Sequence, residues 1–142
     1  MFNMLFGNKK RNKYNAKKIE FDGHVFDSKK EKARYEELVK AANDGIITDL
    51  KRQIRFELEP PVIEEYEEQM KTKTVTKTRT VQRGIYYTCD FQYVKGGELV
   101  VEDVKSSPQQ AKLDKAYQIR KKLLFSRYGI KIKEVFNAKE SV

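Results

Sequence analysis

The sequence predicts a single α/β domain in which one mixed β-sheet is flanked by helices. Amphipathic helical patterns and strand patterns of period two follow one another in the order helix, strand, ribbon, hairpin, helix, strand. No internal repeat and no Pro- or Ser-rich linker divides the 142 residues, a length that suits one core. We therefore expect a basic N-terminal arm over residues 1–18 and one α/β domain over residues 19–142.

Charge and cysteine content narrow the classes of function. The chain has 30 Lys and Arg residues against 21 Asp and Glu, which favours a polyanionic partner, nucleic acid before any other. One cysteine, Cys89, and one histidine, His24, exclude an internal disulfide and a zinc site made of cysteines or histidines. No apolar run approaches the roughly 20 residues of a membrane span, and no secretory signal begins the chain. These features predict a cytoplasmic protein without membrane contact.

The first elements are a small hairpin and a helix. Residues 17–26 alternate weakly around a turn, and Asp27 or Ser28 then caps a helix that we expect to end near Asn43. Glu31 stands three positions after Ser28, so its carboxylate either completes a capping box or faces the core as part of a site. We prefer the site, because an advance of about 100° per residue places Glu31 on the buried stripe. The other members of that stripe are Tyr35, Leu38, Val39 and Ala42.

A strand and an exposed ribbon follow. Residues 48–58 alternate apolar and polar side chains over their whole length, which predicts one continuous strand that ends at Pro60. Residues 64–68 are acidic and residues 71–83 are basic and threonine-rich, so together they predict an exposed β-ribbon. This ribbon is either a solvated hairpin or a basic arm that follows a nucleic-acid backbone. In the second case the contacting residues are Lys71, Lys73, Lys77 and Arg79.

The next segment, residues 86–105, predicts a β-hairpin that carries ionisable groups. Aromatic and β-branched residues fill both halves, and Gly96 and Gly97 form the turn. Asp90 is expected inside the first strand. Asp103 and Lys105 share one face of the second, because strand side chains alternate. Burying ionisable groups in a sheet costs free energy, so we expect these three to belong to a functional site.

A helix and a strand complete the expected core. Ser107 and Pro108 predict a helix that runs to about Arg127, and residues 130–136 alternate as a final strand. Arg120 and Arg127 fall at the edge of the apolar side of this helix, where they either extend their stems over the core or contact phosphates. The apolar side itself consists of Leu113, Ala116, Leu123 and Leu124.

The acids and the lysine of the hairpin suit phosphodiester hydrolysis. Mg²⁺ is a hard ion that prefers oxygen ligands and keeps several waters, so two or three carboxylates can hold it. Asp90 and Asp103 can do so from neighbouring strands, and Lys105 can orient the attacking water or offset phosphate charge. The alternative is an ordinary surface ion pair between Asp103 and Lys105.

These residues resemble the PD-(D/E)XK nuclease superfamily. The pattern is Asp90, then residues 100–105 (Val-Val-Glu-Asp-Val-Lys), with residues 26–35 upstream, which look like the superfamily's "Ser-x-x-Glu-Ala" helix. The resemblance covers about residues 15–136. Within the superfamily the chain is most similar to small phage-encoded proteins that look related to endonuclease I-type Holliday-junction resolvases.

The resemblance implies a restriction-endonuclease-like fold with an αβββαβ core and a role for each matching residue. By position, Glu31 completes the metal shell, Asp90 is the principal metal-binding acid, Asp103 is the second, and Lys105 is the catalytic lysine. Glu102 takes the place of Asp103 if a bulge shifts the register. Two further positions bear on the match. Gln53 matches a glutamine of similar sequences, and Thr88-Cys89 stands where many members have a proline.

The expected function is therefore a Mg²⁺- or Mn²⁺-dependent endodeoxyribonuclease that hydrolyses phosphodiester bonds in duplex or branched DNA, such as a Holliday junction. It would act in phage DNA recombination or processing, in the cytoplasm of the host. A resolvase is expected to be a homodimer, so that two sites cut symmetrically. The alternatives are a non-catalytic DNA-binding accessory of recombination or packaging that keeps the fold, and a protein that binds or cuts RNA.

Overall fold

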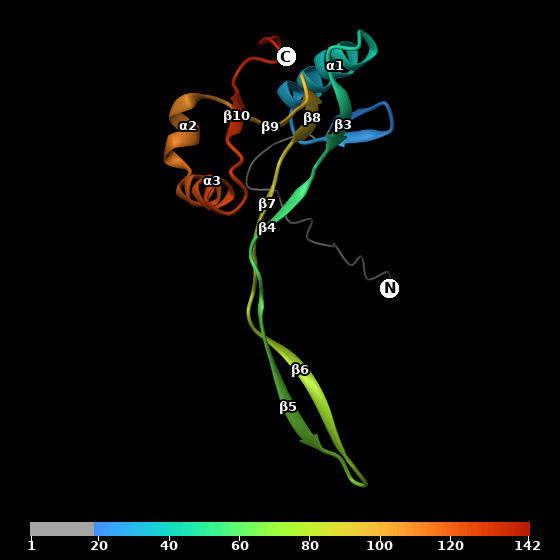
Figure 1. Cartoon of the computed structure of the whole chain (residues 1–142), viewed down its shortest axis with the longest axis vertical. Helices are drawn as coiled ribbons and strands as arrows, with labels where there is room; N and C mark the ends of the chain where they lie inside the picture. The colour runs from blue at the N-terminus through green and yellow to red at the C-terminus, as the bar shows by residue number, and fades with distance from the viewer. Residues whose placement is uncertain (1–18) are drawn as a thin grey trace, which may run out of the picture.

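A four-stranded mixed sheet lies between the helices in the body of the molecule (Figure 1). The computed structural model describes residues 19–142, so the expected basic arm lies outside the described residues. The strand order is β10-β9-β8-β3. β9 pairs antiparallel with β8 and parallel with β10, and β3 pairs antiparallel with β8. The mixed α+β class is thereby confirmed. These strands are β3 (Thr48–Arg52), β8 (Phe91–Lys95), β9 (Glu98–Val104) and β10 (Ile132–Val135).

One face of the sheet is covered by α1 (Lys29–Asn43), which begins and ends where the sequence predicts. The Ser28 hydroxyl caps it by accepting the backbone N–H of Glu31 at 3.1 Å. A short hairpin of β1 (Ile19–Phe21) and β2 (His24–Phe26) precedes the helix, as expected. The core on this face joins helix, hairpin and sheet through Phe26, Tyr35, Leu38, Ala41, Ile47, Phe91 and Tyr93.

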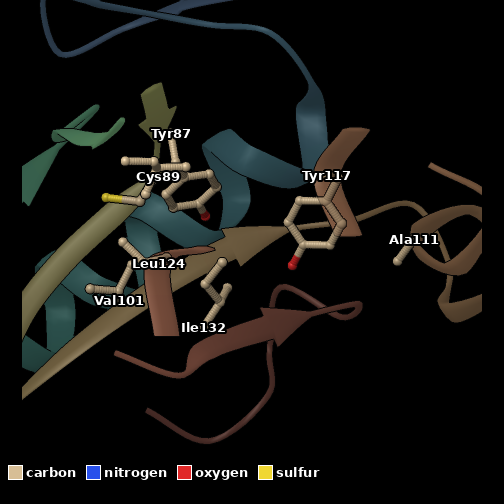
Figure 2. Close-up of a cluster of buried hydrophobic side chains, with 8 residues drawn as sticks. Tyr87, Cys89, Val101, Ala111, Tyr117, Leu124 and Ile132 are labelled. Atoms are coloured by element: carbon tan, nitrogen blue, oxygen red, sulfur yellow. The ribbon is translucent and has the colours of Figure 1, made fainter. Parts of the chain in front are cut away.

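A second buried cluster holds the carboxyl-terminal helices to the sheet. It contains Leu58, Tyr87, Cys89, Val101, Ala111, Tyr117, Leu124 and Ile132. Figure 2 shows Tyr117 between the strand residues of this cluster and Ala111. Each side of the sheet therefore has its own core, with α1 in one and α3 (Lys115–Tyr128) in the other.

The single helix expected from Pro108 is instead two helices. α2 (Pro108–Leu113) ends at Asp114, whose φ of −76° and ψ of 89° leave the helical region. The Asp114 carboxylate then caps α3 by accepting the N–H of Tyr117 at 3.0 Å. Because the helix breaks here, the predicted apolar side is wrong at Leu113, which is 72% exposed, and at Ala116, which is also exposed. Tyr117 is buried in their place.

The single strand expected over residues 48–58 is likewise two strands. β3 ends at Arg52 and β4 (Arg55–Glu59) begins after Gln53, whose φ of 53° turns the chain. β4 leaves the main sheet and pairs with β7 (Ile85–Thr88). The apolar alternation continues through the turn, which is why the sequence gives no sign of it.

The hairpin at residues 86–105 contains a matching break. Asp90 lies between β7 and β8 and not inside one strand, because its backbone N–H leaves the regular ladder to bond the Glu102 carbonyl oxygen at 3.2 Å. Its carbonyl oxygen accepts the N–H of Gln53 at 3.1 Å, so the two breaks are joined. This joint brings Asp90 and Gln53 to the same place beside the sheet.

A long antiparallel ribbon extends far from the body (Figure 1), as predicted. It consists of β5 (Val62–Gln69) and β6 (Thr74–Gln82). β5 follows the two prolines that end β4, because proline cannot continue the hydrogen-bond ladder. Separately, none of the helices within residues 19–142 is both long and apolar enough to cross a membrane.

Candidate functional site

A cavity of about 410 Å³ opens where the two strand breaks meet the start of α3. It brings together four residues singled out from the sequence as chemically active, Gln53, Asp90, Asp103 and Lys105, with Arg120 as a basic residue. Carboxylates, a lysine and an arginine thus share one small space. The remaining lining residues are Asp27, Tyr86, Tyr87, Thr88, Asp114 and Tyr117.

Asp90 is fixed in this cavity by the backbone of the neighbouring strand. Its Oδ2 accepts the N–H of Val104 at 2.7 Å. Burial, reinforced by the negative charge of Asp103 and to a lesser extent of Glu31, raises the pKa of Asp90 to about 8. A buried carboxyl whose pKa is raised by other acids lies where a cation would be stabilised.

Asp103 and Lys105 are held by two buried tyrosines. The Tyr87 hydroxyl donates to Asp103 Oδ2 at 2.7 Å, and Asp103 Oδ1 lies 3.2 Å from Lys105 Nζ. Lys105 Nζ also lies 3.7 Å from the centre of the Tyr117 ring. Burial, followed by the charge of Asp103, raises the pKa of both tyrosine hydroxyls. Both tyrosines therefore stay neutral, one as a hydrogen-bond donor and the other as a cation–π surface.

Glu31 is buried behind the cavity and is not among its lining residues. Its carboxylate makes none of the capping-box contacts with Ser28, because Oε1 accepts from Gln53 Nε2 at 3.3 Å and lies 3.6 Å from Arg52 Nη2. Burial and the nearby charge of Asp27 raise its pKa. Gln53 thus connects Glu31 to the cavity.

Glu102, the alternative to Asp103, points to the opposite face of the sheet. Its carboxylate forms a bidentate pair with Arg34 of α1, at 2.6 and 2.8 Å, and accepts the Tyr93 hydroxyl at 2.6 Å. These contacts with Arg34 and Tyr93 outweigh burial and lower the pKa of Glu102. The geometry therefore places Asp103, and not Glu102, beside Asp90.

The residues of the cavity fit a hard divalent cation by chemistry. Four carboxylates line it, those of Asp27, Asp90, Asp103 and Asp114, and the Asp114 carboxylate already caps α3. As the side chains stand, no three acids, histidines or cysteines within residues 19–142 are gathered closely enough to hold a metal ion. A Mg²⁺ ion would therefore have two direct protein ligands and complete its shell with water, as this ion commonly does.

The basic residues predicted to contact nucleic acid differ in their surroundings. Arg120 lines the cavity, and Arg127 is exposed two turns further along α3. On the ribbon, Arg79 lies 2.7 Å from Glu64, and Lys77 is ion-paired with Glu68. These two ribbon cations are therefore neutralised by the acidic strand, whereas Lys71 and Lys73, in the turn between β5 and β6, are exposed and take part in none of the ion pairs found within residues 19–142.

The family model described as "Protein of unknown function (DUF1064)" matches residues 11–140. The chain belongs to this family. No curated protein and no solved structure matches it closely enough to be counted as a relative.

Several residues that line the cavity were not predicted from the sequence. Asp27 reads as a candidate helix cap, and Tyr87 and Tyr117 read as ordinary core aromatics, which they also are. Tyr86 lines the rim under the guanidinium of Arg55, 3.7 Å from its ring centre. Only the strand alternation of residues 86–88 could have indicated that Tyr87 faces the same side as Asp103.

The two tyrosines of the DUF1064 site predict opposite results for the same substitution. Tyr87→Phe removes a hydrogen bond to a charged group and should lower stability by roughly 1.5–3 kcal/mol. Tyr117→Phe should be neutral or stabilising, because the buried Tyr117 hydroxyl has no hydrogen-bond partner within the described residues and the ring face is retained. Urea unfolding of both variants checks this. Equal losses in the two proteins would contradict the assignment.

Proposed function

We propose that this protein is a metal-dependent endonuclease that hydrolyses phosphodiester bonds in DNA. The observation that carries the proposal is the cavity in which Asp90, Asp103 and Lys105 converge. The pKa of about 8 at Asp90 supports it, because that environment stabilises a bound cation. The net charge of +9 is consistent with a polyanionic substrate.

The residues of the cavity have distinct roles in the proposed reaction. Asp90 and Asp103 would hold Mg²⁺ or Mn²⁺, with Glu31 connected to them through Gln53. When bound, such an ion supplies charge stabilisation and activates water. Lys105, held by Asp103 and by the ring of Tyr117, can orient the attacking water or offset charge on the phosphate. Its fixed position means that little reorganisation is needed during the reaction.

The arrangement of elements supports a PD-(D/E)XK nuclease fold. Glu31 lies on helix α1, and Asp90 directly precedes the β8–β9 hairpin. Asp103 lies in β9 and Lys105 follows it, and α3 and β10 complete the order of elements. By this likeness the substrate would be duplex or branched DNA, a Holliday junction being one candidate, and the active form a homodimer. The setting would be phage DNA recombination or processing in the host cytoplasm.

Cleavage of labelled DNA tests the proposal. We expect Mg²⁺ or Mn²⁺ to be required and Lys105→Ala to slow cleavage by roughly 10²–10⁴-fold, because general-acid, general-base and charge-stabilising groups contribute about that much. Lys40→Ala, at an exposed lysine on α1, is the control and should cleave as the wild type does. A four-way junction, a linear duplex and a single strand are compared. Undiminished metal-dependent cleavage by Lys105→Ala would contradict the catalytic role assigned to Lys105.

A non-catalytic DNA-binding protein is the second candidate, and one observation favours it. Asp103 and Glu31 each have a basic partner already, Lys105 at 3.2 Å and Arg52 at 3.6 Å. Such pairs could satisfy the acids without a metal ion. Calorimetry separates the two functions. Uptake of Mn²⁺ by the wild type that is lost in Asp90→Ala supports the nuclease. No uptake of Mn²⁺ by the wild type, together with a DNA affinity that is the same with and without Mn²⁺, supports the binding protein.

A further inference from the structure

Within residues 19–142 the excess of positive charge is concentrated in one segment. Residues 106–133, which contain α2 and α3, hold eight Lys and Arg residues and one acid, Asp114. By contrast, residues 62–82, which form the ribbon, hold four Lys and Arg residues and four Glu. The excess charge of the described chain therefore lies on the carboxyl-terminal helices and not on the ribbon.

Five of the six basic side chains on the two helices are exposed and lack acidic partners, and the sixth, Lys121, is half-buried and paired with Glu134 of β10. Within residues 19–142, none of the five exposed ones lies within 4.0 Å of a carboxylate in an ion pair. The acids that do form ion pairs are elsewhere, on α1, β3, β5, β9 and β10. We call the five residues the α2–α3 surface: Lys112, Lys115, Arg120, Lys122 and Arg127.

This surface is continuous with the cavity. Arg120 lines the cavity together with Lys105, so the basic surface begins at the proposed reaction centre. Arg127 lies seven positions after Arg120, and Lys122 seven after Lys115, so each pair repeats after about two helical turns, roughly 10 Å along the axis. At about 100° per residue, Arg127 lies on the same side of α3 as Arg120, whereas Lys115 and Lys122 lie about 140–160° further round the helix. A chain of phosphates that left the cavity would therefore meet Arg127 along the same side of α3, and the two lysines extend the surface onto the outer side of the helix.

We propose that the α2–α3 surface binds the phosphate backbone of the nucleic acid whose phosphodiester reaches the cavity. Unpaired Lys and Arg side chains displace the counterions of a nucleic acid when they contact its phosphates, which makes binding favourable and salt-dependent. The proposal rests on the proposed function for the identity of the polyanion. It moves the main contact from the ribbon, whose Lys77 and Arg79 are paired with glutamates, to the helices.

Binding without cleavage tests the proposal. Fluorescence anisotropy with a short labelled DNA duplex in EDTA is measured over a range of salt for the full chain. Lys115→Gln/Lys122→Gln and Arg120→Gln/Arg127→Gln should each weaken binding about tenfold and reduce the salt slope by roughly 2. Lys77→Gln/Arg79→Gln on the ribbon removes the same charge at two residues that are paired with glutamates, and should change affinity less than twofold. Circular dichroism checks the fold of each variant.

Several results would overturn the proposal. The first two are a loss of affinity in the ribbon variant equal to that in the helix variants, and a salt slope in the helix variants that equals that of the wild type. The other two are no duplex binding by the wild type at low salt, and a preference of the wild type for anionic lipid vesicles over nucleic acid. A labelled RNA hairpin of matched length distinguishes the source of the phosphates, since either DNA or RNA binding through the same residues supports the surface. Retained binding without cleavage at any metal concentration counts against the nuclease and not against this surface.

Discussion

Asp90→Asn is expected to abolish metal-dependent cleavage and to make the metal-free protein more stable. The loss of activity should be about 10³-fold or more, because a metal ion supplies several kcal/mol of transition-state stabilisation and each 1.36 kcal/mol is a factor of ten. Asn keeps the shape of Asp and retains an oxygen that can accept the Val104 N–H, a bond of 2.7 Å in the wild type. The change is therefore confined to charge.

The gain in stability follows from the pKa of Asp90. That pKa is about 8 in the folded protein, well above the ordinary aspartate value of 3.8. Between these two pH values the folded state binds more protons than the unfolded state, so the free energy of unfolding falls as pH rises. At pH 7.5, Asp90→Asn should remove this penalty and stabilise the protein by roughly 1–3 kcal/mol, whereas near pH 4 the two proteins should be equally stable.

Thermal unfolding between pH 4 and pH 8, with and without Mg²⁺, measures both parts of this expectation. The ion should raise the melting temperature of the wild type and leave that of Asp90→Asn unchanged, because a ligand stabilises only the state that binds it. Asp90→Ala is the matched control. It also removes the charge but leaves the Val104 N–H without its partner, so it should gain less stability than Asp90→Asn. A variant no more stable than the wild type at pH 7.5 would contradict the proposed electrostatics.

The outline of the fold was predictable because the elements follow local rules. A capping serine and a glycine-containing turn bound α1, and alternation with a Gly-Gly turn identifies the β8–β9 hairpin. The ribbon was also predictable, since proline ends the strand before it. What failed were continuities. Gln53 and Asp114 each interrupt a regular element. The break at Gln53 depends on its hydrogen bond to the distant backbone of Asp90, and the break at Asp114 depends on a helix cap inside a continuous helical pattern.

The candidate site was predictable in part for the same reason. Alternation along β9 separates Asp103 from Glu102, and the structure places them on opposite faces, one beside the cavity and one beside α1. The contribution of Asp27 and Tyr87 could not be predicted, because it depends on how α1 and β7 pack against β9. The roles of all these residues in catalysis stay predictions.

The position of Glu102 leads to the second large expected effect, which concerns folding and not catalysis. Arg34 and Glu102 are both completely buried, and their bidentate pair joins α1 to β9. Arg34 also donates to the carbonyl oxygen of Ala138 at 3.1 Å, which fixes the carboxyl-terminal segment. Arg34→Met should therefore cost roughly 3–5 kcal/mol, because it leaves a buried carboxylate with fewer partners.

A pH profile and a double variant distinguish the pair from simple packing. Because the pKa of Glu102 is lowered in the folded protein, its contribution to stability is present above the unfolded value near 4.5 and is lost as pH falls through the folded value. Arg34→Met should remove that acid-sensitive part, so its stability should fall less steeply below pH 5 than that of the wild type. Arg34→Met/Glu102→Leu should recover most of the lost free energy, since replacing both members of a buried pair with apolar side chains is often neutral. If the double variant is as unstable as Arg34→Met alone in urea unfolding, the loss arises from the other bonds of Arg34 or from packing. Activity per folded molecule should be retained in the double variant, because the pair lies on the face of the sheet opposite Asp103.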